Sequence, residues 1–85
     1  MIDLSIIIVN YNTKSFLKNL LDSIKKSVSK RITYEVIVID NASTDGLPTE
    51  TLSFKLIKNK ENLGFSKANN QGIKASQKSR YLLFL

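Results

Sequence analysis

The sequence has no cysteine and no histidine among its 85 residues, and only one proline and three glycines. Without cysteine the chain has no disulfide bond, no cysteine-ligated zinc and no thiol nucleophile. Without histidine it lacks the imidazole metal ligand and the commonest general acid and base. The low glycine and proline content excludes collagen-like and low-complexity classes. Any catalysis is therefore left to Asp, Glu, Lys, Tyr and backbone dipoles.

Long apolar runs are also missing, since no segment approaches the roughly 18–20 residues that cross a bilayer. The start, Met1-Ile2-Asp3, lacks the basic region of a signal peptide. Hydrophobic residues make up 42% and charged residues 24%, which is typical of a globular protein. We therefore expect one unit over residues 1–85 in a cytoplasmic protein.

The charge is unbalanced, with 13 Lys and Arg against 7 Asp and Glu and a net charge of +6. An excess of this sign favours a polyanionic partner such as a nucleotide, a nucleic acid or an anionic membrane face. Lys25, Lys26, Lys30 and Arg31 form the only dense group, and they could simply complete the end of a helix. Nucleic-acid binding is disfavoured, because most of the seven aromatic residues lie on apolar stripes.

Two short, β-branched, almost continuously apolar segments, Leu4–Val9 and Tyr34–Ile39, predict strands that are covered on both faces of a parallel sheet. The residues between them recur with helical spacing, and Asn12 or Thr13 is a candidate cap for the start of that helix. The apolar positions of this helical stripe are Phe16, Leu17, Leu20, Leu21, Ile24 and Val28. Strand, helix and strand together predict a right-handed βαβ unit.

The second half of the chain predicts a third strand at Phe54–Lys58, a helix that begins near Phe65, and a fourth strand at Tyr81–Leu85. The stripe of this second helix consists of Phe65, Ala68, Gly72, Ile73 and Ala75. Gly72 inside a helix costs roughly 1 kcal/mol against Ala, so a packing reason is expected there. A domain rarely ends on an apolar central strand. We therefore expect Leu85 to be a truncation point that leaves exposed apolar surface at this edge and favours self-association.

Ligands of open α/β sheets bind beyond the carboxyl ends of the strands, where this chain has Asn10-Tyr11-Asn12 and Asp40-Asn41-Ala42-Ser43. Asp40 could accept a hydrogen bond from a base or a ribose, or it could close a local turn with its own backbone. Tyr11 could stack on a planar ring, or it could be a tyrosine at the edge of the core. Asn10 and Asn12 are most simply interpreted as helix caps.

Phosphate-binding fingerprints are missing after the first strand, which has neither G-x-G-x-x-G nor G-x-x-x-x-G-K-[ST]. This argues against dinucleotide-binding enzymes of the Rossmann type and against P-loop NTPases. The segment Asn62–Lys67 leads into a helix whose free N–H groups could face an anion, but with a single glycine the segment is better explained as a plain loop-to-helix turn.

Four segments in this order resemble family 2 glycosyltransferases. Ser5–Asn12 resembles their opening strand, and Val36–Gly46 resembles their second strand with its D-[ND]-x-S-x-D-[GN] turn. Asn62–Gly72 is similar to their N-x-G-x-x-x-A-x-N-x-G helix. Tyr81–Leu85 matches the strand that normally runs into a metal-binding D-x-D motif. The Gly-Phe and Asn-Asn wording is closest to the rhamnosyltransferase-like branch.

The resemblance implies an α/β, Rossmann-like nucleotide-diphospho-sugar-binding half-domain: a truncated parallel sheet of about four strands, ordered 3-2-1-4, with two main helices. It implies that Asp40 hydrogen-bonds a pyrimidine N3–H and that Val9 and Tyr11 border the nucleoside. Asp45 is expected to support the loop. Many members carry arginine where this chain has Asn69, which argues against a charged contact with the pyrophosphate there. The nucleotide-binding residues implied in this way are Val9, Asn10, Tyr11, Asp40, Asn41, Asn62 and Asn69.

The chemistry implied by the resemblance is sugar transfer, with inversion, from a UDP- or dTDP-sugar to a glycan or lipid-linked acceptor in cell-surface polysaccharide synthesis. A divalent metal, Mg or Mn, is expected for the full-length enzyme, and its ligands are absent from this chain. No residue of the chain fits a catalytic role, so we expect it to be inactive alone. The alternative is a stand-alone, non-catalytic nucleotide-binding or interaction module.

Overall fold

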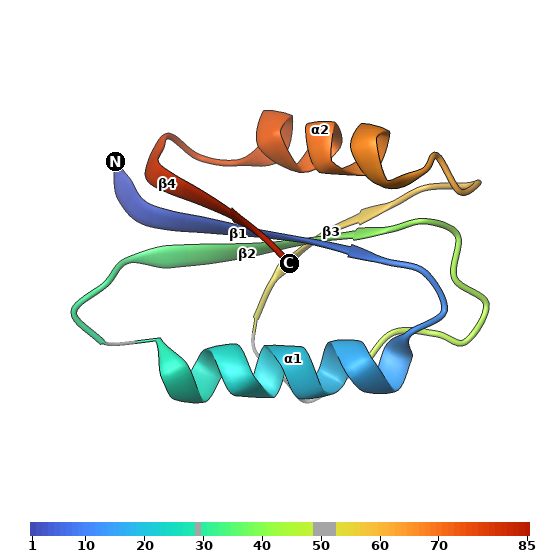
Figure 1. Cartoon of the computed structure of the whole chain (residues 1–85), viewed down its shortest axis with the longest axis horizontal. Coiled ribbons are helices and arrows are strands. Elements are labelled where there is room, and N and C mark those ends of the chain that lie inside the picture. The colour runs from blue at the N-terminus through green and yellow to red at the C-terminus, as the bar shows by residue number, and fades with distance from the viewer. Residues whose placement is uncertain (29, 49–52) are drawn as a thin grey trace.

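The computed structural model describes residues 1–28, 30–48 and 53–85. Its elements in chain order are β1 (Ile2–Asn10), α1 (Lys14–Ser27), β2 (Tyr34–Asp40), β3 (Lys55–Lys58), α2 (Phe65–Ala75) and β4 (Ser79–Phe84). The strands form one parallel sheet in the order β3-β2-β1-β4, with α1 on one face and α2 on the other (Figure 1). The predicted α/β class, the strand order and both helices are confirmed.

The register follows from the two apolar runs. Ile6 pairs with Val36 and Val9 pairs with Ile39, so that β1 and β2 lie side by side along most of their length. Successive residues of a strand point to opposite faces, so each run supplies both layers of the core. Continuous hydrophobicity is therefore needed here, whereas alternation would leave one face open to water.

Two apolar clusters hold the layers together, and each fully buried Ile, Leu or Val contributes about 1.5–3 kcal/mol by leaving water. The cluster on the α1 face consists of Ile6, Ile8, Leu17, Leu21, Ile24, Val36 and Val38. The cluster on the α2 face consists of Ile7, Ile37, Ile39 and Ala68. Both helices thus dock on the two central strands.

The predicted helical stripes were too wide. Phe16 is 68% exposed, because it lies beside the buried positions Leu17 and Leu21 on α1 and not among them. Val28 follows the last residue of that helix. On α2 the buried residues are Ala68 and Gly72, whereas Phe65 and Ile73 are exposed. Residues three or four positions apart occur on every face of a helix. Their spacing alone therefore did not distinguish the residues that face the core from those that lie beside them.

The outer strand β4 is exposed as expected. It pairs with β1 on one side only, and Leu82 and Phe84 are 41% and 43% exposed. Apolar side chains on an edge strand with free backbone groups form a surface that other chains can pair with. Self-association through this edge remains a prediction.

Gly72 lies where α2 crosses the sheet. A Cβ at this position would overlap Cγ2 of Ile7 and lie 3.0 Å from Cδ1 of Ile39, so the helix backbone rests directly on the two central strands. The expected packing reason for this glycine is confirmed.

At the start of β2, the end of the sheet opposite to Asp40, one buried carboxylate links four segments of the chain. Oε2 of Glu35 accepts hydrogen bonds from Ser5 Oγ on β1 and from the backbone N–H of Gln77 before β4, both at 2.7 Å. Oε1 of Glu35 lies 3.0 Å from the ammonium of Lys55 on β3. Burial raises the pKa of the Glu35 carboxyl, but these hydrogen bonds and the Lys55 charge outweigh burial and hold that pKa below its usual value.

The packing at residue 72 predicts that Gly72→Ala destabilises the protein. Alanine normally favours a helix by about 1 kcal/mol over glycine, but overpacking against Ile7 costs about 1–3 kcal/mol, so a net loss is expected. Lys74→Ala, an exposed substitution on the same helix, is the matched control and should leave stability nearly unchanged. Urea unfolding measures both free energies. A Gly72→Ala protein at least as stable as the wild type would contradict the contact.

The low pKa of Glu35 predicts a pH dependence of stability. A carboxyl whose pKa is lower in the folded state stabilises the fold above its unfolded pKa, and this contribution is lost as pH falls through the folded-state pKa. Between about pH 6 and about pH 3, the melting temperature should therefore fall more for the wild type than for Glu35→Gln. Glu61→Gln, at an exposed carboxylate, is the control. An equal fall in melting temperature for the wild type and Glu35→Gln over this pH range would show that the carboxylate contributes nothing to stability.

Candidate functional site

The carboxyl ends of the two central strands carry polar side chains that face each other. Asn10 ends β1 and Asp40 ends β2, and the two residues are partners in the parallel register. Nδ2 of Asn10 donates to Oδ1 of Asp40 at 2.9 Å. Both side chains are buried, with Asp40 only 1% exposed. The sheet thus brings two predicted site residues into direct contact.

Ser43 completes this pair from the loop after β2. Its hydroxyl donates to Oδ1 of Asp40, and its backbone N–H donates to Oδ2 of Asp40 at 3.2 Å. The same hydroxyl accepts from Asn10 Nδ2 at 3.3 Å and from the backbone N–H of Asn12 at 2.9 Å. Asp40 therefore closes a local turn, the structural role that the sequence left open beside the ligand role. Three donors contact its carboxylate, which has about four acceptor positions.

The loops after β1 and β2 each contain a non-glycine residue with a positive φ, and a hydrogen bond joins the two loops. Asn12 has φ +52° and Ala42 has φ +64°, both in the left-handed region. Oδ1 of Asn12 accepts from the backbone N–H of Thr44 at 2.7 Å. Asparagine tolerates this conformation, but alanine does so at a cost of order 1–3 kcal/mol. Non-glycine residues in this region cluster at ligand sites and switch segments.

The predicted caps of α1 are wrong. Thr13 takes the N-cap position but makes no side-chain bond to the helix, and its hydroxyl donates to Oδ1 of Asn10. The Asn12 side chain is bound to Thr44. Oδ2 of Asp45, from the loop after β2, instead accepts from the first helical N–H, of Lys14, at 3.0 Å. A carboxylate at this end also interacts favourably with the helix dipole.

Val9 and Tyr11 flank Asn10. Val9 is half-buried against the cluster on the α2 face, so its side chain forms part of the apolar surface near the carboxyl ends of the strands. Tyr11 is 49% exposed, which leaves a ring surface for a planar ligand.

Asn41 and Asn62 are held by other parts of the chain. Asn41 is buried; its Oδ1 accepts from Asn59 Nδ2 at 2.8 Å, and its Nδ2 donates to the carbonyl of Gly64 at 3.4 Å. Oδ1 of Asn62 accepts from the backbone N–H of Gly64 at 2.8 Å, which tightens the turn into α2. Asn59 was not predicted, although its position directly after β3 was a signal that could have found it.

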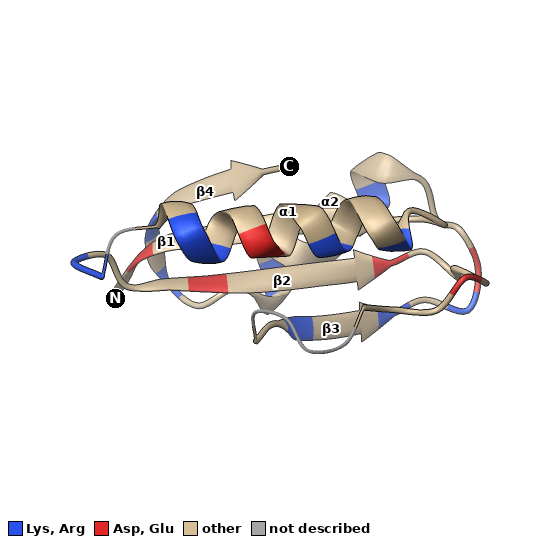
Figure 2. Cartoon of the chain, turned by 90° about the horizontal axis from the view of Figure 1, so that it is seen from below, with Lys and Arg blue, Asp and Glu red and all other residues tan. Residues whose placement is uncertain are grey.

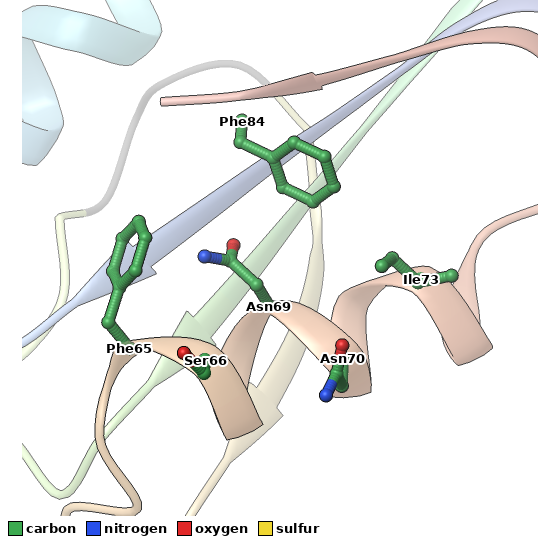
Figure 3. Close-up of a pocket in the computed structure, with 6 residues that line it drawn as sticks. All are labelled: Phe65, Ser66, Asn69, Asn70, Ile73 and Phe84. Carbon is green, nitrogen blue, oxygen red and sulfur yellow. The ribbon is translucent and has the colours of Figure 1, made fainter.

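A pocket of about 360 Å³ lies between α2 and β4 (Figure 3). Its lining residues are Phe65, Ser66, Asn69, Asn70, Ile73 and Phe84. Figure 3 shows the Asn69 amide between the rings of Phe65 and Phe84. Oδ1 of Asn69 is buried and has no hydrogen-bond partner among the described residues. The predicted residue Asn69 thus belongs to this pocket, whereas no hydrogen bond joins it to the Asp40 cluster within the described part of the chain.

Figure 2 shows Lys and Arg on both helices, on β3 and in the loops at both ends of the sheet. Lys25 and Lys26 lie in the last turn of α1, and Lys30 and Arg31 follow that helix closely. Because α1 runs back along the strands, this group lies at the opposite end of the sheet from Asp40 (Figure 1). The basic cluster therefore does not serve a ligand bound at the strand ends.

The described residues contain neither the ligand cluster that a metal site requires nor a helix that could span a membrane. No three Asp or Glu side chains among residues 1–28, 30–48 and 53–85 come close enough to hold a metal ion. In the same part of the chain, neither helix has the length and apolar character needed to cross a bilayer.

Comparison with known proteins agrees with this arrangement. The sequence profile of glycosyl transferase family 2 matches residues 5–85. An uncharacterized glycosyltransferase of Haemophilus influenzae is 36% identical over 85 residues, which cover 96% of this chain and 28% of that protein. The chain therefore spans less than a third of the length of this relative. Members of the family transfer a sugar from a nucleotide donor, generally with a divalent metal. The match over almost the whole chain shows that it belongs to glycosyl transferase family 2.

Proposed function

We propose that this chain forms the nucleoside-binding half of a nucleotide-sugar site, specific for a UDP- or dTDP-sugar. The observation that carries the proposal is the Asp40 carboxylate, fixed at the carboxyl end of a central strand with both oxygens oriented by protein donors. Ligands of open α/β sheets bind at this edge. A fixed carboxylate suits a pyrimidine that presents a ring N–H.

Asp40 has the acceptor capacity for such a contact. Among the described residues, its Oδ1 accepts two side-chain hydrogen bonds, from Asn10 and Ser43, whereas its Oδ2 accepts only one, from the backbone N–H of Ser43. A carboxylate offers about four acceptor positions, so Oδ2 can accept the N3–H of uracil or thymine. Asn10 and Asn41 would contribute by holding Asp40 and its turn, and Asn62 by shaping the loop before α2.

Tyr11 and Val9 would border the nucleoside, with the exposed ring of Tyr11 stacking on the base. On α2, the unpartnered Oδ1 of Asn69 would accept a hydrogen bond from a hydroxyl group of the nucleotide-sugar. The Asn69 amide is neutral, so this contact brings no positive charge to the diphosphate.

The full reaction would transfer the sugar, with inversion, to a glycan or lipid-linked acceptor in cell-surface polysaccharide synthesis. The family and the net charge of +6, which suits an anionic membrane face, support this assignment. The enzyme would be cytoplasmic and act at the inner face of the membrane. Magnesium or manganese would be held by oxygen ligands supplied from outside this chain, since the described residues do not fit a metal site.

A UDP analogue whose ring N3–H is replaced by N-methyl tests the role of Asp40. Wild-type chain should bind UDP at least tenfold more tightly than N3-methyl-UDP, because the methyl group removes the N–H that Asp40 accepts. Asp40→Asn should abolish that preference, whereas Asp22→Asn, at a half-buried carboxylate of α1 that pairs with Lys18, should retain it. Isothermal titration calorimetry measures each dissociation constant. Equal affinity of the wild type for both ligands would overturn the assignment.

Tyr11→Ala gives a second route that does not disturb the buried cluster. Loss of base stacking should weaken UDP binding by about five- to a hundredfold without changing the melting temperature. Unchanged affinity would exclude the ring from the site.

The 85-residue chain should transfer no sugar by itself. A radiolabelled UDP- or dTDP-sugar assay with magnesium or manganese and a lipid-linked acceptor measures this. Any transfer above that of a heat-denatured sample would show that the reacting groups lie within the chain.

A further inference from the structure

Two side-chain amides outside the predicted site form a closed pair beneath the Asp40 turn. Nδ2 of Asn59 donates to Oε1 of Gln71, and Nε2 of Gln71 donates back to Oδ1 of Asn59, each at 2.8 Å. Each amide gives one hydrogen bond and accepts one, as two carboxamides do in a cyclic dimer. The pair joins the residue after β3 to the middle of α2.

The pair also contacts the loop that follows β2. The second hydrogen of Asn59 Nδ2 is donated to Oδ1 of Asn41 at 2.8 Å. The backbone N–H of Asn59 donates to the carbonyl of Asp40 at 2.9 Å. Asn59 therefore binds both residues of the Asp40-Asn41 dipeptide, through its backbone to one and through its side chain to the other.

All three polar groups of the Asn59 side chain are thus in use: both hydrogens of its amide nitrogen and its oxygen. The network links the loop after β2, the end of β3 and helix α2, and it orients the Asn41 amide by binding its Oδ1. Asn41 directly precedes Ala42, whose φ of +64° is unfavourable for a residue with a side chain. Such a conformation persists only where the surroundings over-determine it, and the amide pair supplies part of that constraint.

We propose that Asn59 and Gln71 are positioning residues for the nucleotide: their amide pair holds Asn41, and through it keeps the Asp40 turn in the conformation that receives the base. The statement about binding rests on the proposed nucleotide site, whereas the statement about the turn does not. Asn59 and Gln71 would therefore control affinity without touching the ligand.

Nuclear magnetic resonance tests the turn without any ligand. In Asn59→Ala and in Gln71→Ala, the backbone amides of residues 40–43 and the side-chain amide of Asn41 should shift, while the methyl groups of Ile7 and Ile37 stay in place. Asn19→Ala and Gln77→Ala remove exposed amides elsewhere and are the matched controls. Unshifted resonances for residues 40–43 would overturn the positioning role whether or not the protein binds a nucleotide.

Calorimetric titration with UDP tests the consequence for binding. Asn59→Ala should weaken UDP binding by about five- to tenfold, as expected for the loss of a side-chain hydrogen-bond network. In an Asn41→Ala background, the same substitution should change the affinity by less than about twofold, because Asn59 acts through Asn41. A thermal melt of each variant verifies that it is folded at the titration temperature.

The outcomes separate the two proposals. If the wild type binds UDP and Asn59→Ala binds it equally well, the positioning role is wrong and the nucleotide site stands. If the effects of Asn59→Ala and Asn41→Ala on affinity are fully additive, Asn59 does not act through Asn41 and the inference is also overturned. If the wild type does not bind UDP, the proposed function fails, and the resonances of residues 40–43 then decide whether the pair positions the turn.

Discussion

The hydrogen bond between Asn10 and Asp40 is the contact on which the carboxyl edge of the sheet depends. It exists because β1 and β2 pair in parallel with Asn10 opposite Asp40, so that both strands end at the same level. Ser43 binds this pair, and through Ser43 the loop after β2 is attached to Asn12 in the loop after β1. One register thus sets the position of the two loops relative to each other.

The two ends of the sheet show how polar groups are placed in a small core. At one end, Glu35 is surrounded by Ser5, Lys55 and the Gln77 backbone, so its role is to join segments. At the other end, Asp40 is more deeply buried than Glu35 but retains acceptor capacity, and the exposed Tyr11 directly follows its partner Asn10. Burial and internal hydrogen bonding alone therefore do not distinguish the structural role of Glu35 from the binding role proposed for Asp40. The position of Asp40 at the carboxyl end of the strands is what favours that proposal.

Much of the fold was predictable from the sequence, because it depends on patterns that are local along the chain. The runs Leu4–Val9 and Tyr34–Ile39 indicated central strands, and the motif order indicated the strand order. The caps were not predictable, because the group that caps α1 is Asp45, 31 residues from its partner Lys14. The amide pair of Asn59 and Gln71 was missed for the same physical reason, since its partners meet only once α2 has docked on the sheet.

The position of β1 in the sheet also has a consequence for synthesis on the ribosome. β1 lies between β2 and β4, and its register with β4 pairs residues that are separated by 77 positions, as Ile2 and Ser79 are. β1 must therefore wait for β4, which is translated much later, before both of its edges are covered. Contacts this distant in sequence slow folding, and a nascent chain carries one open apolar edge of β1 until β4 has emerged. Chaperones that shield extended apolar segments would act on the chain in that interval.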